Sequence, residues 1–186
     1  MGKIFYIADM HFGHANIMKY DNRPWFSVAD MDRALINNWN SVVTNDDTVY
    51  ILGDVSWYKT DRLIEILDQL NGQKFLIKGN HDRIHDNKLR AMFVKIVDYL
   101  EIKDNGRDVV LCHYPIPCFK NHFYGWYHLY GHVHNSFEAR MMEHCEREMT
   151  DLYEKQCNMC NVGCMMDYMN YTPRTLDEII KVKGWK

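Results

Sequence analysis

Short apolar runs alternate with helix-periodic stretches through the first half of the chain. Residues 3–8, 47–52 and 73–78 predict strands, and residues 27–40 and 60–71 between them predict helices. This alternation predicts a mostly parallel sheet flanked by helices. Ligands of such sheets bind beyond the carboxyl ends of the strands, so the residues that follow each strand are the first candidates for function.

The two helices carry end signals and an apolar face. Ser27 and Asp30 fit a capping box at the start of the first helix. Thr60 is predicted to cap the second helix, and Asn71 with Gly72 to end it. The core-facing side of the first helix is expected to comprise Met31, Leu35 and Trp39.

The second half of the chain predicts a hairpin and further elements. Residues 97–103 and 107–112 flank Asp104-Asn105-Gly106, which is typical of a hairpin turn. Residues 126–130 predict another strand, and residues 138–156 are polar and helix-prone.

The C-terminal part completes a single predicted domain, residues 1–186. Residues 161–163 are expected to form a short strand or turn, and Thr175 with Glu178 fits a capping box for a terminal helix. Residues 138–160 are the best candidate for a peripheral insertion or lid.

Composition narrows the class of protein. The chain has 186 residues, of which 47% are apolar and 25% charged, as is ordinary for a globular protein. Its net charge of −3 excludes a global basic field for gripping nucleic acid, though not a local basic groove. No stretch approaches the roughly 20 apolar residues of a membrane span, and no leader pattern is visible. We therefore expect a cytoplasmic protein whose six cysteines are free thiols.

Five predicted strands end at residues that can bind metal. Asp9 and His11 form a D-x-H pair, and His132 and His134 an H-x-H pair; in extended backbone, residues two apart point to the same side. Gly53, Gly79 and Gly131 each precede a polar residue, and glycine permits close backbone approach. The ligand candidates are Asp9, His11, Asp54, Asn80, His113, His132 and His134.

This donor set suits two catalytic metal ions. It mixes carboxylates, an amide and imidazoles, which favours manganese, iron or zinc over calcium or a structural zinc site. Seven ligands are too many for one open ion, but they suit two ions that share a carboxylate and clamp a phosphoryl group. Asp54 is the expected bridge. His81 is assigned as general acid or transition-state donor, with Asp82 to orient it.

Other residues have a functional and a structural interpretation. His14 and Asn16 are candidates for binding substrate, or they pack the loop. Arg23 is a candidate for binding phosphate, or it pairs with Asp21 or Asp30.

The aromatic stretch 119–127 and the cysteines admit two interpretations as well. His122 lies in the aromatic stretch, and His128 follows it directly. The stretch either stacks on a base or packs the core. Cys157, Cys160 and Cys164 resemble half a zinc site, but no matching second pair exists.

In chain order these motifs resemble the calcineurin-like metallophosphoesterase family, whose pattern is D-x-H, G-D, G-N-H-[DE], a lone His and G-H-x-H. The match runs from roughly residue 3 to residue 134. It implies an α/β fold of four layers, an α-β-β-α sandwich with mixed sheets. It implies a first metal on Asp9, His11 and His134, a second on Asn80, His113 and His132, a bridging Asp54 and a catalytic His81. Residues 9–17, 21–24, 161–163 and 171–173 also resemble a small bacterial and phage-type subfamily.

A departure from the family pattern and the net charge indicate which of the possible functions is favoured. Many phosphatases of the family carry G-D-x-x-D-R-G, whereas residues 53–59 here read Gly-Asp-Val-Ser-Trp-Tyr-Lys and lack the arginine. The leading hypothesis is a metal-dependent hydrolase of phosphodiesters, or of phosphomonoesters, with a nuclease on DNA or RNA as the alternative. A non-catalytic scaffold is the second alternative. The expected partner is a phosphate ester, with nucleotides among the candidates; no membrane partner and no particular oligomeric state are predicted.

Overall fold

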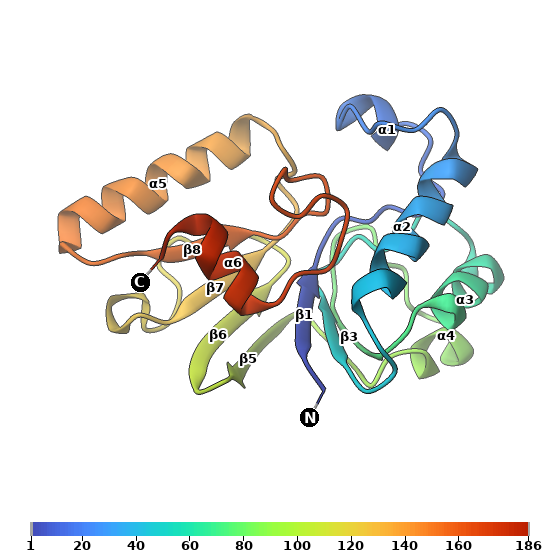
Figure 1. The fold of residues 1–186 in the computed structure, drawn as a ribbon, viewed down its shortest axis with the longest axis horizontal. Helices are drawn as coiled ribbons and strands as arrows, with labels where there is room; N and C mark the ends of the chain where they lie inside the picture. Colours follow the sequence, from blue (N-terminus) through green and yellow to red (C-terminus); the bar gives the residue numbers. More distant parts are fainter. Residues whose placement is uncertain (1, 186) are drawn as a thin grey trace.

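The computed structural model describes residues 2–185, and within this range the strands form two four-stranded sheets (Figure 1). The first sheet is parallel throughout, in the order β1-β2-β3-β4. Its strands read as continuous apolar runs because both faces of the sheet are covered. The strands are β1 (Ile4–Ile7), β2 (Thr48–Ile51), β3 (Gln73–Ile77) and β4 (Lys95–Val97). The predicted parallel sheet is confirmed, with β4 as an additional strand.

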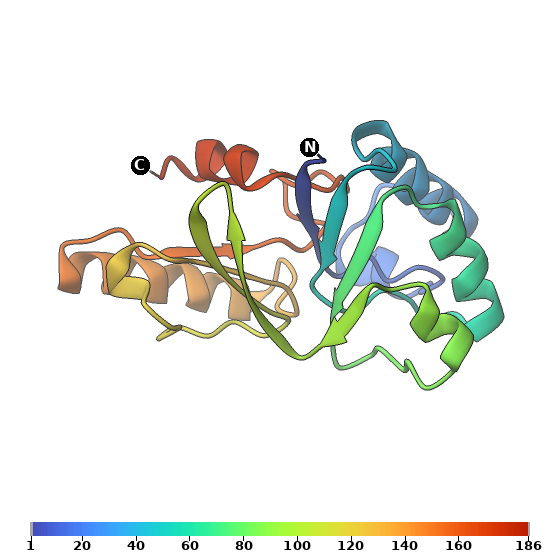
Figure 2. The ribbon, with the colours of Figure 1, turned by 90° about the horizontal axis from the view of Figure 1, so that it is seen from below.

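Three helices lie on the face of the first sheet that points away from the second sheet (Figure 2). They are α2 (Val28–Val42), α3 (Thr60–Gln69) and α4 (Asn87–Ala91), and the short α1 (Ile17–Tyr20) precedes them. The buried face of α2 contains Met31, Leu35 and Trp39, as predicted. Ser27 caps this helix by accepting the backbone N–H of Asp30 at 3.1 Å.

The ends of α3 differ from the prediction. Lys59, not Thr60, is the extended residue before the helix, so Thr60 lies inside the first turn and its predicted capping role is wrong. The helix ends at Gln69, two residues before Asn71. Trp39 donates its indole N–H to the Asn71 carbonyl at 2.9 Å, which ties this exit to α2.

The second sheet has the order β5-β6-β7-β8 and is mixed, because β5 pairs antiparallel and the other strands pair parallel. Asn105 and Gly106 both have positive φ, 49° and 82°, which gives the predicted hairpin turn. The predicted strand 97–103 is divided, since Val97 ends β4 in the first sheet and β5 begins at Tyr99. The strands are β5 (Tyr99–Asp104), β6 (Arg107–Cys112), β7 (Tyr127–Tyr130) and β8 (Asn158–Asn161), and a 3-10 turn, η1 (His122–Tyr124), precedes β7.

Helix α5 (Phe137–Tyr153) covers the outer face of the second sheet. Its Ala139 and Met149 pack with Val110 and Met159 of the sheet. The helix is a layer of the fold, and residues 158–160 lie in β8, which pairs with β7; the interpretation of residues 138–160 as a peripheral insertion or lid stays a prediction.

The C-terminal segments border the free edge of β1. Tyr6 donates its backbone N–H to the Arg174 carbonyl at 2.8 Å, and Ala8 to the Val162 carbonyl at 2.9 Å. The predicted capping box of Thr175 and Glu178 is present at the start of α6 (Leu176–Lys183), which lies beside β1. Together the sheets and helices form the expected four-layer α-β-β-α arrangement (Figures 1 and 2).

The structure also bears on the predictions for a membrane span and for the aromatic stretch. Among residues 2–185, no helix has the length and apolar character needed to cross a membrane. In the aromatic stretch, His128 is fully buried, with Nδ1 donating to the Val110 carbonyl and Nε2 accepting from the backbone of Ile116. His128 and the buried Phe119 therefore pack the core rather than a ligand.

His128 is expected to make stability depend on acid pH. Burial lowers the pKa of its imidazole from the ordinary 6.5 to about 4 in the folded chain. The unfolded state thus binds more protons between these two values, so the free energy of unfolding falls as pH drops through this window. The loss attributable to His128 is roughly 3 kcal/mol. His128→Gln keeps a donor and an acceptor, and urea unfolding across this pH range should show a flatter slope; an unchanged slope would contradict the assignment.

Candidate metal centre

The candidate ligands meet where the strands of both sheets end. Asp9 follows β1, Asp54 follows β2, Asn80 follows β3, His113 follows β6, and the pair His132 and His134 follows β7. A cavity of about 650 Å³ opens over this meeting point. Its lining includes His11, His14, Trp57, His81, His132 and His134.

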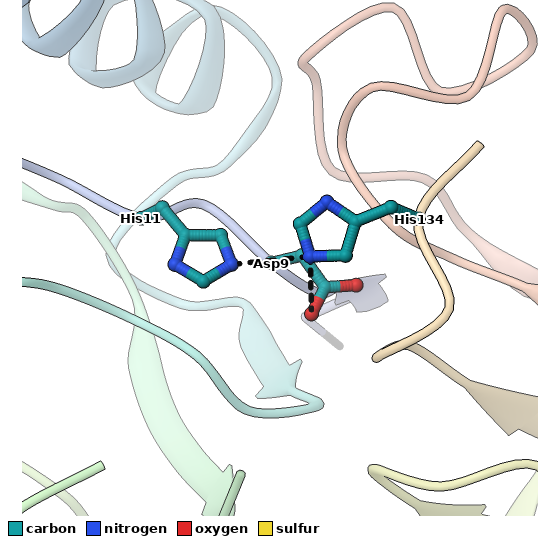
Figure 3. Close-up of side chains that lie close together, drawn as sticks. All are labelled: Asp9, His11 and His134. Carbon is teal, nitrogen blue, oxygen red and sulfur yellow. Dashed lines mark hydrogen bonds and ion pairs between the residues drawn. The ribbon is translucent and has the colours of Figure 1, made fainter. Parts of the chain in front are cut away.

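The first ligand group comprises Asp9, His11 and His134 (Figure 3). The Nε2 atoms of His11 and His134 lie 3.2 Å apart, and His134 Nε2 lies 4.0 Å from Asp9 Oδ1. Asp9 and His11 are almost completely buried, and one ligand atom from each residue falls within 4.8 Å of the others. This grouping matches the three residues expected to hold a first metal.

The second group comprises Asp9, Asp54 and His113. Asp54 faces both groups: its Oδ2 is 3.7 Å from His11 Nε2, and its Oδ1 is 3.8 Å from His113 Nε2. Asn80 adds its Oδ1 at 3.0 Å from His113 Nε2. A carboxylate with one oxygen toward each group has the geometry that a bridge requires.

The contact between His113 and Asn80 indicates whether this donor set fits a cation. His113 Nδ1 lies 2.8 Å from the Leu52 carbonyl, which can only accept, so Nδ1 carries the proton of the neutral ring. Nε2 then presents a lone pair to Asn80 Oδ1, which is also an acceptor. Two acceptors this close repel unless a cation lies near both, and a histidine whose other nitrogen donates to a carbonyl is typical of a metal ligand. The residues present therefore fit a metal site.

His132 stands apart from both groups. Its ring centroid lies 5.1 Å from that of His113 and 4.6 Å from that of Tyr114. Its backbone N–H, however, donates to both oxygens of Asp9, at 3.1 and 3.0 Å. The backbone of His132 thus positions Asp9, and its imidazole as a second-metal ligand stays a prediction.

The backbone at the ligands is left-handed. Positive φ occurs at Asp9 (56°), His11 (52°), Asp54 (54°), His132 (69°) and His134 (49°). The expectation that each i, i+2 pair converges through extended backbone is therefore wrong; tight turns bring the side chains together. Such torsions cost about 1–3 kcal/mol each in non-glycine residues and persist only where the surroundings impose them.

Two glycines permit the close packing of these turns. A Cβ on Gly79 would lie 2.3 Å from Asp54 Oδ1, and one on Gly131 would lie 2.7 Å from Asp9 Oδ2. No side chain fits at either position without displacing a ligand carboxylate.

His81 lies at the rim, with 43% of its side chain exposed and its Nε2 4.0 Å from Asp54 Oδ2. The predicted orientation of His81 by Asp82 is not observed. Both Asp82 oxygens are occupied, since they accept the backbone N–H groups of Gly79 at 2.8 Å and of Asp54 and Val55 at 2.9 Å. Asp82 thus holds the loops that carry Asp54 and Asn80, and its catalytic role stays a prediction.

Trp57 is a site residue that the sequence motifs do not mark. Its ring stacks on His14 with centroids 4.1 Å apart and planes 7° apart, and its centroid lies 4.4 Å from that of His81. An aromatic residue three positions after Asp54 is the one available sequence signal. Trp57 is 47% exposed and forms a wall of the cavity beside His81.

The three predicted substrate-binding residues lie in different places. His14 lines the cavity, whereas Asn16 is exposed at the start of α1 and outside the lining found among the described residues. Arg23 is buried behind the site and pairs with Asp21 at 2.9 Å, which matches the structural alternative. The two ligand groups within residues 2–185 contain no cysteine, and Cys157, Cys160 and Cys164 are buried free thiols.

Burial sets the protonation of the donors. It raises the pKa of the Asp9 carboxyl to about 6. Burial, reinforced by nearby His134, lowers the pKa of His11 to about 2, so this ring is neutral and free to donate a lone pair. Burial also opposes charge on His134, but the hydrogen bond to Asp21 and the charge of Asp9 prevail and raise its pKa. Cation binding at this group therefore competes with protons.

Several known proteins are similar to this chain. The chain is 35% identical over 185 residues to an uncharacterised protein of Methanocaldococcus jannaschii, covering 98% of this chain and 92% of that protein. It is 32% identical over 134 residues to the gene 66 protein of Mycobacterium phage L5, covering 62% and 64% of the two chains. A crystal structure of a protein of unknown function from Aquifex aeolicus has a TM-score of 0.73 at 26% identity, covering 98% of this chain and 100% of that one.

A family model gives the most specific match. The model of the calcineurin-like phosphoesterase family matches residues 2–154, a stretch that contains every candidate ligand. The family implies divalent metal ions and a phosphate-ester substrate. The chain belongs to the calcineurin-like phosphoesterase family.

Proposed function

We propose that the chain hydrolyses small phosphodiesters with the help of two transition metal ions, manganese, iron or zinc. The observation that carries the proposal is the pair of ligand groups that share Asp9, with one oxygen of Asp54 facing each group. When bound, the two ions would hold phosphoryl oxygens and supply a hydroxide near neutral pH.

The chain's own residues position and protonate the reacting groups. Asp54 holds the two ligand groups in register, since it reaches His11 on one side and His113 on the other. His81 is half-exposed at the cavity, within reach of a bound ester, and protonates the leaving oxygen or donates a hydrogen bond to it. Trp57 packs beside His81 and limits the positions its ring can take.

The cavity lining favours a diester over a more highly charged substrate. Among the described residues that line it, none is Lys or Arg, while Glu138 is acidic. A phosphodiester carries a single negative charge, so the bound metals suffice to balance it. A monoester or a long nucleic acid carries more charge and usually meets additional cationic side chains.

Hydrolysis of bis(p-nitrophenyl) phosphate by the purified protein tests the proposal. Turnover with added manganese that a chelator abolishes supports the two-metal diesterase. Turnover of p-nitrophenyl phosphate alone would make the protein a monoesterase, and binding of oligonucleotides with a steep salt dependence would favour the nuclease alternative. Full metal occupancy without hydrolysis of any ester would favour the scaffold alternative.

Asp54→Ala is expected to remove most activity, by roughly 100-fold or more, because the carboxylate that faces both ligand groups is lost. Metal content measured by plasma mass spectrometry should fall in parallel. Asp61→Ala changes an exposed residue in the first turn of α3; it is the matched control and should keep both activity and metal. Wild-type activity in Asp54→Ala would rule out the bridging role.

His81→Ala is expected to lower turnover by roughly 100-fold on a poor alkyl leaving group, while metal content stays unchanged. On a p-nitrophenyl ester, whose leaving group needs little protonation, the loss should be much smaller. The exposed His85 lies in the same loop, and His85→Ala supplies the control. An equal loss on both leaving groups would mean that His81 binds the phosphoryl group rather than protonating the leaving oxygen.

A further inference from the structure

Asp21 and Arg23 form a buried ion pair behind the first ligand group, in the loop between α1 and α2. The side chain of Arg23 is 0% exposed and that of Asp21 is 3% exposed. Arg23 Nε and Nη2 both donate to Asp21 Oδ2, at 3.0 and 2.9 Å. Burying an ion pair costs free energy unless further hydrogen bonds satisfy both partners. Asp21 and Arg23 are therefore expected to make further hydrogen bonds.

The second oxygen of Asp21 contacts a candidate ligand. His134 Nδ1 lies 2.9 Å from Asp21 Oδ1. An ionised carboxylate only accepts, so the neutral His134 ring must carry its proton on Nδ1. Nε2 is then left with a lone pair, and Nε2 is the atom that faces Asp9 and His11.

The remaining donors of Arg23 hold the turn that carries the other two ligands. Arg23 Nη1 donates to the Met10 carbonyl at 2.8 Å, and Nη2 donates to the Asp9 carbonyl at 2.9 Å. Those carbonyls belong to the two peptide units between Asp9 and His11. Asp9 and His11 both have positive φ. One planar guanidinium thus contacts Asp21 and the strained turn at once, a geometry that a lysine ammonium cannot reproduce.

We propose that Asp21 and Arg23 are positioning residues for the first ligand group. Asp21 fixes the tautomer and ring orientation of His134, and Arg23 fixes both Asp21 and the turn of Asp9 and His11. This inference rests on the proposed function, because the position of His134 Nε2 matters for activity only if that atom binds a metal. The hydrogen bonds of Asp21 and Arg23 themselves involve residues of this chain alone.

Asp21→Asn gives a sharp test because Arg23 has only donors. The amide oxygen of Asn must turn toward Arg23, which leaves the amide NH₂ facing His134 Nδ1. His134 must then accept at Nδ1, and its proton moves to Nε2, the atom that would bind metal. Long-range proton–nitrogen NMR spectra of the metal-free protein at about pH 9, above the ordinary histidine pKa, report this switch directly.

The expected result is a tautomer change at His134 with none at His113. His113 donates to the Leu52 carbonyl and does not depend on Asp21, so it serves as an internal control for general misfolding. Manganese affinity, measured by competition with a fluorescent chelator, should weaken roughly 10–100-fold in Asp21→Asn and in Arg23→Lys. Asp108→Asn and Arg62→Lys, which alter surface ion pairs, are the matched controls and should leave it unchanged.

An unchanged His134 tautomer in Asp21→Asn overturns the proposal, as does unchanged manganese affinity in both variants. A switch at both His134 and His113 also overturns it, because the effect is then not specific. If the wild-type protein binds manganese but hydrolyses no ester, the proposed function fails while the His134 result still decides this inference.

Discussion

The site depends on the mutual repulsion of hydrogen-bond acceptors held close together. His113 Nε2 faces Asn80 Oδ1 at 3.0 Å, with the carboxylate of Asp54 3.8 Å from the same nitrogen. In a buried setting such an arrangement costs free energy, because the lone pair on His113 Nε2 has left water without gaining a donor. A pair of cations at the shared carboxylates would reverse the sign of this energy.

The loops at the strand ends hold these acceptors in place. Left-handed turns at five ligand positions, close approach at Gly79 and Gly131, and three backbone hydrogen bonds to Asp82 fix the loops at the strand ends. The left-handed torsions reduce stability, and the two glycines leave no room for a side chain. The sheets supply the opposing stabilisation, since a continuous apolar core runs between them.

The sequence indicates the candidate ligands because each one follows an apolar strand. The carboxyl ends of the strands of both sheets meet whatever their exact torsions, so Asp9, Asp54 and His113 lie close together even though the extended-backbone argument for the D-x-H pair is wrong. The division of residues 97–103 between two sheets is not visible in an apolar run, because both sheets demand the same pattern.

Partners of long polar side chains are harder to predict than ligands. Arg23 and Asp82 each have the residue type expected of a substrate or catalytic contact, yet their atoms are engaged by backbone groups from distant segments. Trp57 reaches His14 and His81 only through the folding of three loops. Such contacts depend on tertiary geometry, which spacing along the chain does not encode.

The central claim is that the two ligand groups hold a pair of ions joined by shared carboxylates. Manganese titration of the metal-free protein, followed by electron paramagnetic resonance, tests it most directly. The account predicts binding of two manganese ions per chain, with a spectrum of two exchange-coupled ions that Asp54→Ala abolishes. A single uncoupled ion per chain, or no binding, would contradict it.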